Sequence, residues 1–313
     1  MKKTLKNVLI VAFAISTLNL VACGSKVAEN KTDSEGSTES TVTAEVTIAS
    51  EITTEEITTE EAIYHSVYSW DREFFDGDPA AVLSEISDYK PTRIYQGLYP
   101  ADLREPAKTE KTVKALAAEG IEVVYLTGDP DWEDPAVVEE WTIDLLTAYN
   151  SLVSEEAQIH SVCFDAEFYA HEGWDNEEHF RDYTKMMKSV IEYTHEKGFK
   201  FILSAPYWLT DFSEEVYADL IAAADELSCM IYLVGQEEEK LESIYQMCKD
   251  GNTKFEIILE TQEVSEEYGV SEYNTYRCHG GKTAVLAAAQ RLQEEYPDIS
   301  IGFHSLKFML TLE

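Results

Sequence analysis

A short run in the middle of the chain carries the residue types best suited to chemistry. The run Val162-Cys163-Phe164-Asp165-Ala166-Glu167 is apolar until it ends in two carboxylates. It has the composition of a buried strand, and residues two apart in a strand point to the same side. We therefore expect Asp165 and Glu167 to share one face at the end of a strand. A nearby like charge raises the pKa of a carboxyl group, so Asp165 favours a protonated Glu167 that can act as an acid.

Apolar runs between turn signals predict eight strands along the chain. Several are continuous Val, Ile, Leu and Phe runs, as in parallel strands that are covered on both faces. The predicted strands are Ile63–Trp70, Arg93–Leu98, Glu122–Thr127, Ile159–Glu167, Lys200–Ala205, Ser228–Val234, Lys254–Glu260 and Ile299–His304.

Helical patterns fill the gaps between these strands. They cover Ala80–Ser87, Thr109–Ala118, Pro135–Leu152, Asn176–His195, Glu214–Ala224, Glu237–Lys249 and Lys282–Tyr296. This alternation predicts an α/β fold of the (β/α)8 TIM-barrel type, and the few residues after the last strand leave the eighth helix short or missing. The alternative is an open doubly wound sheet, which would show a Gly-rich turn after an early strand.

Barrel active sites are built at the carboxyl ends of the strands. There the sequence places a third acid, Glu260, together with aromatic residues and a histidine. Flat rings stack on sugar rings and acids bind or activate hydroxyl groups, so this rim predicts a carbohydrate-binding cleft. The expected substrate-binding residues are Trp70, Tyr95, Trp132, Tyr207, Trp208, Tyr232 and His304.

The ends of the fourth and sixth predicted strands resemble those of family 18 glycoside hydrolases. Asp165-Ala166-Glu167 is similar to the Asp-x-Glu that closes that family's fourth strand, and Met230-Ile231-Tyr232 is similar to its Met-x-Tyr. The resemblance implies that Glu167 is the acid, while Asp165 and Tyr232 orient a substrate N-acetyl group that itself attacks. The chain departs from that family at His160, Cys163 and Leu233.

A second resemblance, to clan A glycoside hydrolases, pairs Glu167 on the fourth strand with Glu260 on the seventh. Ala166 stands where those enzymes have Asn. A carboxyl separation of about 5–5.5 Å would indicate a retaining pair, and about 6.5–9.5 Å an inverting one. A third arrangement combines Asp165, Glu167, Glu260 and His304, so the second catalytic group stays open.

The N-terminus has the pattern of an export signal. Lys2, Lys3 and Lys6 precede an apolar stretch that is short for a membrane span. The stretch ends in Leu20-Val21-Ala22-Cys23, which resembles the bacterial lipobox. The resemblance implies removal of residues 1–22, lipid on Cys23 and attachment to the extracytoplasmic face of the cell membrane. The alternatives are an ordinary secretory signal and an uncleaved anchor.

Residues 23–62 are rich in Ser, Thr and Glu and predict a disordered stalk, which leaves 63–313 for the barrel. The whole chain carries a formal charge of -36. This charge disfavours nucleic acid as a partner, since such binding needs clustered Lys and Arg.

No motif for a metal or cofactor stands out, and the long loop 261–281 is expected to be a lid or a wall beside the substrate. Two functions remain as hypotheses. One is a surface-anchored glycoside hydrolase acting on an extracellular or cell-wall glycan. The other is a non-catalytic lipoprotein that binds carbohydrate or serves as a scaffold on the same fold.

Overall fold

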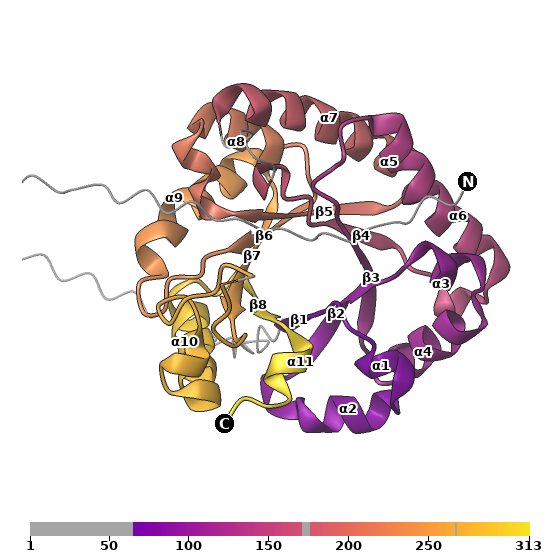
Figure 1. The fold of residues 1–313 in the computed structure, drawn as a ribbon, viewed down its shortest axis with the longest axis horizontal. Coiled ribbons are helices and arrows are strands. Elements are labelled where there is room, and N and C mark those ends of the chain that lie inside the picture. Colours follow the sequence, from indigo (N-terminus) through magenta and orange to yellow (C-terminus); the bar gives the residue numbers. More distant parts are fainter. Residues whose placement is uncertain (1–64, 171–175, 267) are drawn as a thin grey trace, which may run out of the picture. The chain divides into compact units, whose positions relative to one another are not determined.

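Eight parallel strands close into a barrel in chain order, with β8 beside β1 (Figure 1). The computed structural model describes residues 65–170, 176–266 and 268–313. The signal peptide, lipidated Cys23 and stalk predicted within residues 1–62 lie outside the described residues. The strands are β1 His65–Ser69, β2 Pro91–Gly97, β3 Glu122–Thr127, β4 Ser161–Phe164, β5 Lys200–Pro206, β6 Glu226–Met230, β7 Lys254–Glu260 and β8 Ser300–His304.

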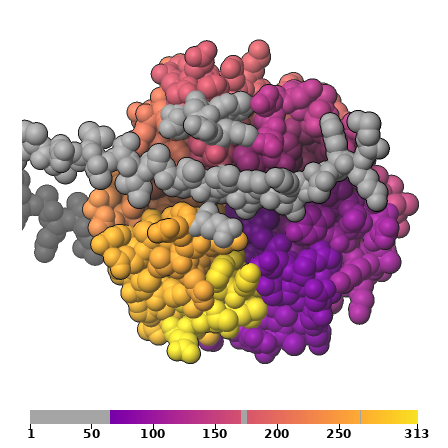
Figure 2. All heavy atoms as spheres, in the orientation of Figure 1, coloured from indigo at the N-terminus to yellow at the C-terminus, as the bar shows by residue number. Residues whose placement is uncertain are grey.

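Helices form a ring around the barrel (Figure 1). They are α1 Glu73–Asp76, α2 Pro79–Glu85, α3 Pro100–Arg104, α4 Ala107–Ala118, α5 Pro135–Trp141, α6 Ile143–Leu152, α7 Glu177–Glu196, α8 Glu214–Ile221, α9 Glu238–Gly251, α10 Gly281–Glu295 and α11 Leu306–Met309. The four-residue α11 follows β8, which confirms that the eighth helix is short. Figure 2 shows the C-terminal residues beside the first part of the barrel, as the pairing of β1 with β8 requires.

The helix predicted over 135–152 is interrupted at Thr142, and α5 and α6 replace it. The Thr142 hydroxyl donates to the carbonyl of Val138 at 2.5 Å. The Thr142 backbone leaves the helical region, with φ -123° and ψ -73°, and a threonine bond of this kind often accompanies a bend in a helix.

Two of the predicted strands, those that become β4 and β6, end three or four residues earlier than the apolar pattern suggests. β4 ends at Phe164, although the Asp165 amide still donates to the Thr127 carbonyl of β3 at 2.8 Å. The chain then turns back on itself, because the Ala170 amide donates to the Glu167 carbonyl in a short 3-10 helix. Glu167 therefore lies in the turn after the strand. Tyr232 likewise follows β6, which ends at Met230.

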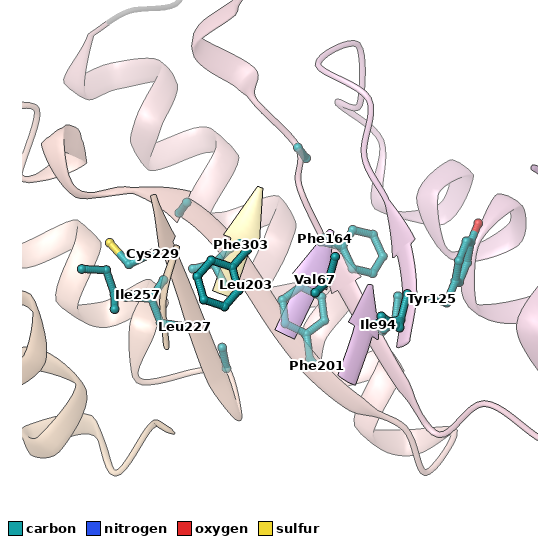
Figure 3. Packing of buried hydrophobic residues seen from close by; sticks show 14 of the residues in the cluster. Val67, Ile94, Tyr125, Phe164, Phe201, Leu203, Leu227, Cys229, Ile257 and Phe303 are labelled. Atoms are coloured by element: carbon teal, nitrogen blue, oxygen red, sulfur yellow. The ribbon is translucent and has the colours of Figure 1, made fainter. Parts of the chain in front are cut away.

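The strands separate two apolar layers. Residues facing outward pack against the helices, and Figure 3 shows part of this outer layer, including Phe164, Phe201 and Phe303. Residues at the alternate positions fill the barrel itself. This interior layer consists of Tyr68, Tyr95, Val124, Leu126, Cys163, Ile202, Met230 and Ile258.

Below the apolar interior, toward the amino ends of the strands, lies a buried polar network. Arg93 donates to Glu226 at 2.7 Å and to Glu122 at 2.9 Å. The Tyr95 hydroxyl donates to Glu256 at 2.8 Å and accepts from Arg93 at 3.0 Å. These bonds stabilise charges that burial would otherwise make costly. The network joins strands from opposite sides of the barrel. Different residues form the rim at the carboxyl ends of the strands.

Candidate functional site

The carboxyl ends of β4, β7 and β8 bring together four of the predicted site residues. Asp165 and Glu167 follow β4, Glu260 closes β7, and His304 closes β8. After burial and Glu260, the charges of Asp165 and Glu167 also affect the pKa of His304 and raise it, while His304 partly opposes the rise that burial causes in the pKa of both carboxyl groups. The three side chains therefore form one electrostatically coupled group at the barrel rim.

Asp165 and Glu167 form a pair that favours bound protons. Burial, and then the charge of Glu167, raises the pKa of Asp165 to about 7, against the opposing charge of His304. Burial also raises the pKa of Glu167. Because the two groups interact, they titrate as a pair, and the pair retains a proton near neutral pH. One oxygen of Asp165, Oδ1, has no hydrogen-bond partner among the described residues.

A neighbouring tyrosine holds Glu167 in place. The Tyr169 hydroxyl donates to Glu167 Oε1 at 2.7 Å, which stabilises the charged form and opposes the rise in its pKa. The Tyr169 ring in turn packs edge-on against Trp208, with 4.5 Å between ring centroids. Glu167 is thus oriented by a residue two positions further along the chain.

Glu260 is engaged by protein groups through both of its carboxylate oxygens. Oε2 accepts from His304 Nδ1 at 3.0 Å, and Oε1 accepts from the Gln262 amide at 2.7 Å. The residue is only 1% exposed. The carboxamide nitrogen of Gln262 lies 2.9 Å from the same His304 nitrogen. This geometry is that of a carboxylate that orients a histidine.

His304 is held from several sides. Burial alone would lower the pKa of its imidazole, but the charge and hydrogen bond of Glu260 raise it above its ordinary value. The Tyr232 ring faces the imidazole, with centroids 6.2 Å apart and planes at 24°. Both the amide and the hydroxyl of Thr261 donate to the His304 carbonyl, at 2.7 and 2.8 Å. The imidazole therefore has a fixed orientation.

The predicted aromatic residues separate into two groups. Half-buried side chains are found at Trp70, Trp132, Tyr207, Trp208 and Tyr232, all beyond the ends of their strands.

Tyr95 differs from these residues, and the prediction that it contacts substrate is wrong. It is fully buried within β2, and its hydroxyl is bound to Glu256 in the polar network. Because β2 continues to Gly97, Tyr95 lies two residues deeper in the barrel than the strand end.

Tyr169, Thr261 and Gln262 contact the site residues but were not among the predicted site residues. Tyr169 and Gln262 lie two positions beyond Glu167 and Glu260, and this spacing was the signal available in the sequence. Thr261 binds the His304 carbonyl through its backbone amide and its hydroxyl, and no sequence pattern predicts such bonds.

Neither a metal-binding cluster nor a membrane-spanning helix is found among the residues that the structure describes. Within those residues, no group of three or more His, Cys, Asp or Glu side chains is arranged to hold a metal ion. None of the helices described is long and apolar enough to cross a membrane.

Neither a protein family nor a curated protein sequence matches the chain. Its fold is similar to that of a chitinase from Chromobacterium violaceum, with a TM-score of 0.50 and 11% sequence identity over 80% of this chain and 97% of that one. It is also similar to the GH99 endo-alpha-mannosidase from Bacteroides thetaiotaomicron, with a TM-score of 0.51 and 11% identity over 79% of this chain and 85% of that one. At such identities the likeness concerns the fold, which is a (β/α)8 TIM barrel.

Proposed function

We propose that the protein is a glycoside hydrolase that cleaves an N-acetylated extracellular or cell-wall glycan, with Glu167 as its acid. The observation that carries this proposal is the Asp165–Glu167 pair at the barrel rim, whose pKa values are raised by burial. The coupled pair keeps a proton near neutral pH, and Glu167 can deliver this shared proton to a glycosidic oxygen. The barrel fold hosts many chemistries, so the argument depends on these residues and not on the fold.

The proposed reaction uses one acid and two nucleophiles in turn, the N-acetyl carbonyl oxygen and then water. Glu167 donates its proton to the glycosidic oxygen as the bond from that oxygen to the anomeric carbon breaks. The carbonyl oxygen of the substrate N-acetyl group attacks the same carbon and forms a cyclic intermediate. Water then opens this ring and returns a proton to Glu167, so that the product sugar keeps its N-acetyl group.

Asp165 supports this route because Oδ1 is an acceptor without a partner in the described residues. It can accept a hydrogen bond from the N–H of the N-acetyl group and so turn the carbonyl toward the anomeric carbon. Tyr232 supplies a donor. Burial, followed by the charges of Glu260, Asp165 and Glu167, raises the pKa of its phenol well above the ordinary value, so the hydroxyl keeps its proton.

Glu260 acts through His304 in this proposal. Both oxygens of Glu260 already accept hydrogen bonds, which leaves it poorly placed to attack a sugar. Instead it orients His304 and favours the imidazolium form. A positive charge near Asp165 and Glu167 stabilises the carboxylate that remains after proton transfer.

The test compares oligosaccharides that differ only in the N-acetyl group. Purified protein is incubated with β-1,4-linked hexamers of N-acetylglucosamine and of glucosamine, and new reducing ends are measured. We expect cleavage of the acetylated hexamer only, and a loss of at least about 100-fold in Asp165→Asn. Equal cleavage of both hexamers would refute substrate assistance. Saturable binding without new reducing ends would support the non-catalytic carbohydrate-binding protein instead.

We also propose that the protein is anchored to the extracytoplasmic face of the cell membrane by lipid on Cys23, at the end of the stalk 23–62. The lipobox-like Leu20-Val21-Ala22-Cys23 supports this. Cells fed labelled palmitate should label the wild type and not Cys23→Ala, and only the wild type should enter the detergent phase on partitioning. An unlabelled wild type that stays in the aqueous phase would contradict the anchor.

A further inference from the structure

The loop between β7 and α10 presents an unusually exposed aromatic residue. Tyr273 is 71% exposed, the highest value among the large hydrophobic side chains in the described parts of the chain. A scattered exposed tyrosine is common on protein surfaces. The backbone around Tyr273, however, is fixed beside the candidate site.

Four consecutive residues directly after Tyr273 each donate a hydrogen bond to another part of the barrel rim. Asn274 Nδ2 donates to the Tyr232 carbonyl at 2.9 Å, and Thr275 Oγ1 donates to the Gln262 carbonyl at 2.7 Å. The remaining bonds run from the Tyr276 hydroxyl to the buried carboxylate of Glu237, and from Arg277 Nη2 to the Phe308 carbonyl at 2.7 Å.

The first two of these anchors lead directly to His304. The Tyr232 ring faces the His304 imidazole, and the Gln262 carboxamide contacts it. The backbone that carries Tyr273 is therefore attached to the same two residues that surround the histidine.

A tight turn restricts Tyr273 from its other side. Asn274 Oδ1 accepts from the Ser271 amide at 3.0 Å, and the Asn274 amide donates to the Ser271 carbonyl at 3.1 Å. The Tyr273 amide lies 3.3 Å from Ser271 Oγ, to which it donates. Little backbone entropy remains to be lost when a ligand contacts this side chain.

We propose that Tyr273 stacks on a sugar ring beyond the bond that is cleaved, so that the site takes a glycan chain of several sugars. This inference rests on the proposed function and names the substrate class more closely. An aromatic side chain that is open to water and carried by an ordered backbone binds the apolar face of a sugar ring without the cost of ordering the loop. Side chains at the ends of β4 and β8 act on the bond, while Tyr273 extends the binding surface along the chain.

The test measures binding, so that it does not depend on turnover. Dissociation constants are determined by calorimetry for hexamers and dimers of β-1,4-linked N-acetylglucosamine and of α-linked mannose. All variants carry Glu167→Gln to prevent cleavage. Tyr273→Ala is compared with Tyr273→Phe, which keeps the ring. Trp141→Ala, at a 46% exposed aromatic residue on α5, is the surface control.

We expect one hexamer to bind more tightly than its dimer, and Tyr273→Ala to weaken hexamer binding about tenfold relative to the dimer. Tyr273→Phe and Trp141→Ala should preserve the preference. The inference is overturned when no hexamer binds more tightly than its dimer, or when Tyr273→Ala leaves the preference intact. Absence of hydrolysis by the wild type, by contrast, would refute the proposed reaction, while the dissociation constants alone decide whether Tyr273 binds a sugar ring.

Discussion

Gly302 lies on β8, two residues before His304, and points into the barrel at a place with no room for a side chain. A Cβ at this position would lie 2.8 Å from Ser66 Oγ and 3.3 Å from Glu256 Cδ. Both neighbours are completely buried. Overpacking of this kind costs about 1–3 kcal/mol. At about 2–4 °C per kcal/mol for a domain of this size, Gly302→Ala should lower the melting temperature measurably.

The same contact predicts a partner substitution that restores stability. Ser66→Ala removes the nearest atom, and Ser66 Oγ has no hydrogen-bond partner among the described residues, so its loss costs little. The double variant should recover at least half of the lost free energy of unfolding, measured by urea denaturation followed by circular dichroism. The reasoning is refuted by a Gly302→Ala protein within about 0.5 kcal/mol of the wild type, or by a double variant no more stable than Gly302→Ala.

Three further predictions concern the site. Asp165 has a folded pKa of about 7 against 3.8 for the free group, so its contribution to stability is present at low pH and is lost as the pH rises across this window. The melting temperature of Asp165→Asn minus that of the wild type at the same pH should therefore increase from pH 4 to pH 8. A difference that stays constant over this range would contradict the raised pKa of Asp165. Tyr169→Phe removes the hydrogen bond to Glu167, which should lower kcat/KM about tenfold. Because this bond opposes the rise in the pKa of Glu167, its loss should also move the alkaline limb of the pH profile to higher pH, and an unchanged limb would argue against the bond. Glu260→Gln should cost about 1.5–3 kcal/mol of stability and lower the pKa of His304 measured by NMR, whereas an unchanged pKa would exclude the pairing.

The barrel itself was predictable because its strands are continuous apolar runs bounded by polar turns. β3 and β7 have the predicted bounds, Glu122–Thr127 and Lys254–Glu260. The end of β4 was not predictable in the same way. Asp165 and Glu167 continue the alternating pattern of a strand, but the chain turns at Ala166 once the β3 strand beside it has ended.

The site was predictable in its residue types and only partly in its contacts. Glu260 and His304 are register partners on neighbouring strands, and strand register is a property of the assembled sheet. The sequence therefore named both residues without revealing that one holds the other. An aromatic residue near a strand end has the pattern of a sugar-stacking residue, so the sequence predicts Tyr95 at the rim, whereas its depth in the barrel depends on where β2 ends.

The central claim is that Glu167 delivers the proton that breaks the glycosidic bond. The most direct measurement is kcat of Glu167→Gln on the N-acetylglucosamine hexamer, beside the same substitution at Glu178, an exposed acid in the first turn of α7. Melting temperature and circular dichroism of both variants should match the wild type. We predict a loss of at least about 100-fold for Glu167→Gln and none for Glu178→Gln. A folded Glu167→Gln protein that turns over near the wild-type rate would contradict the account.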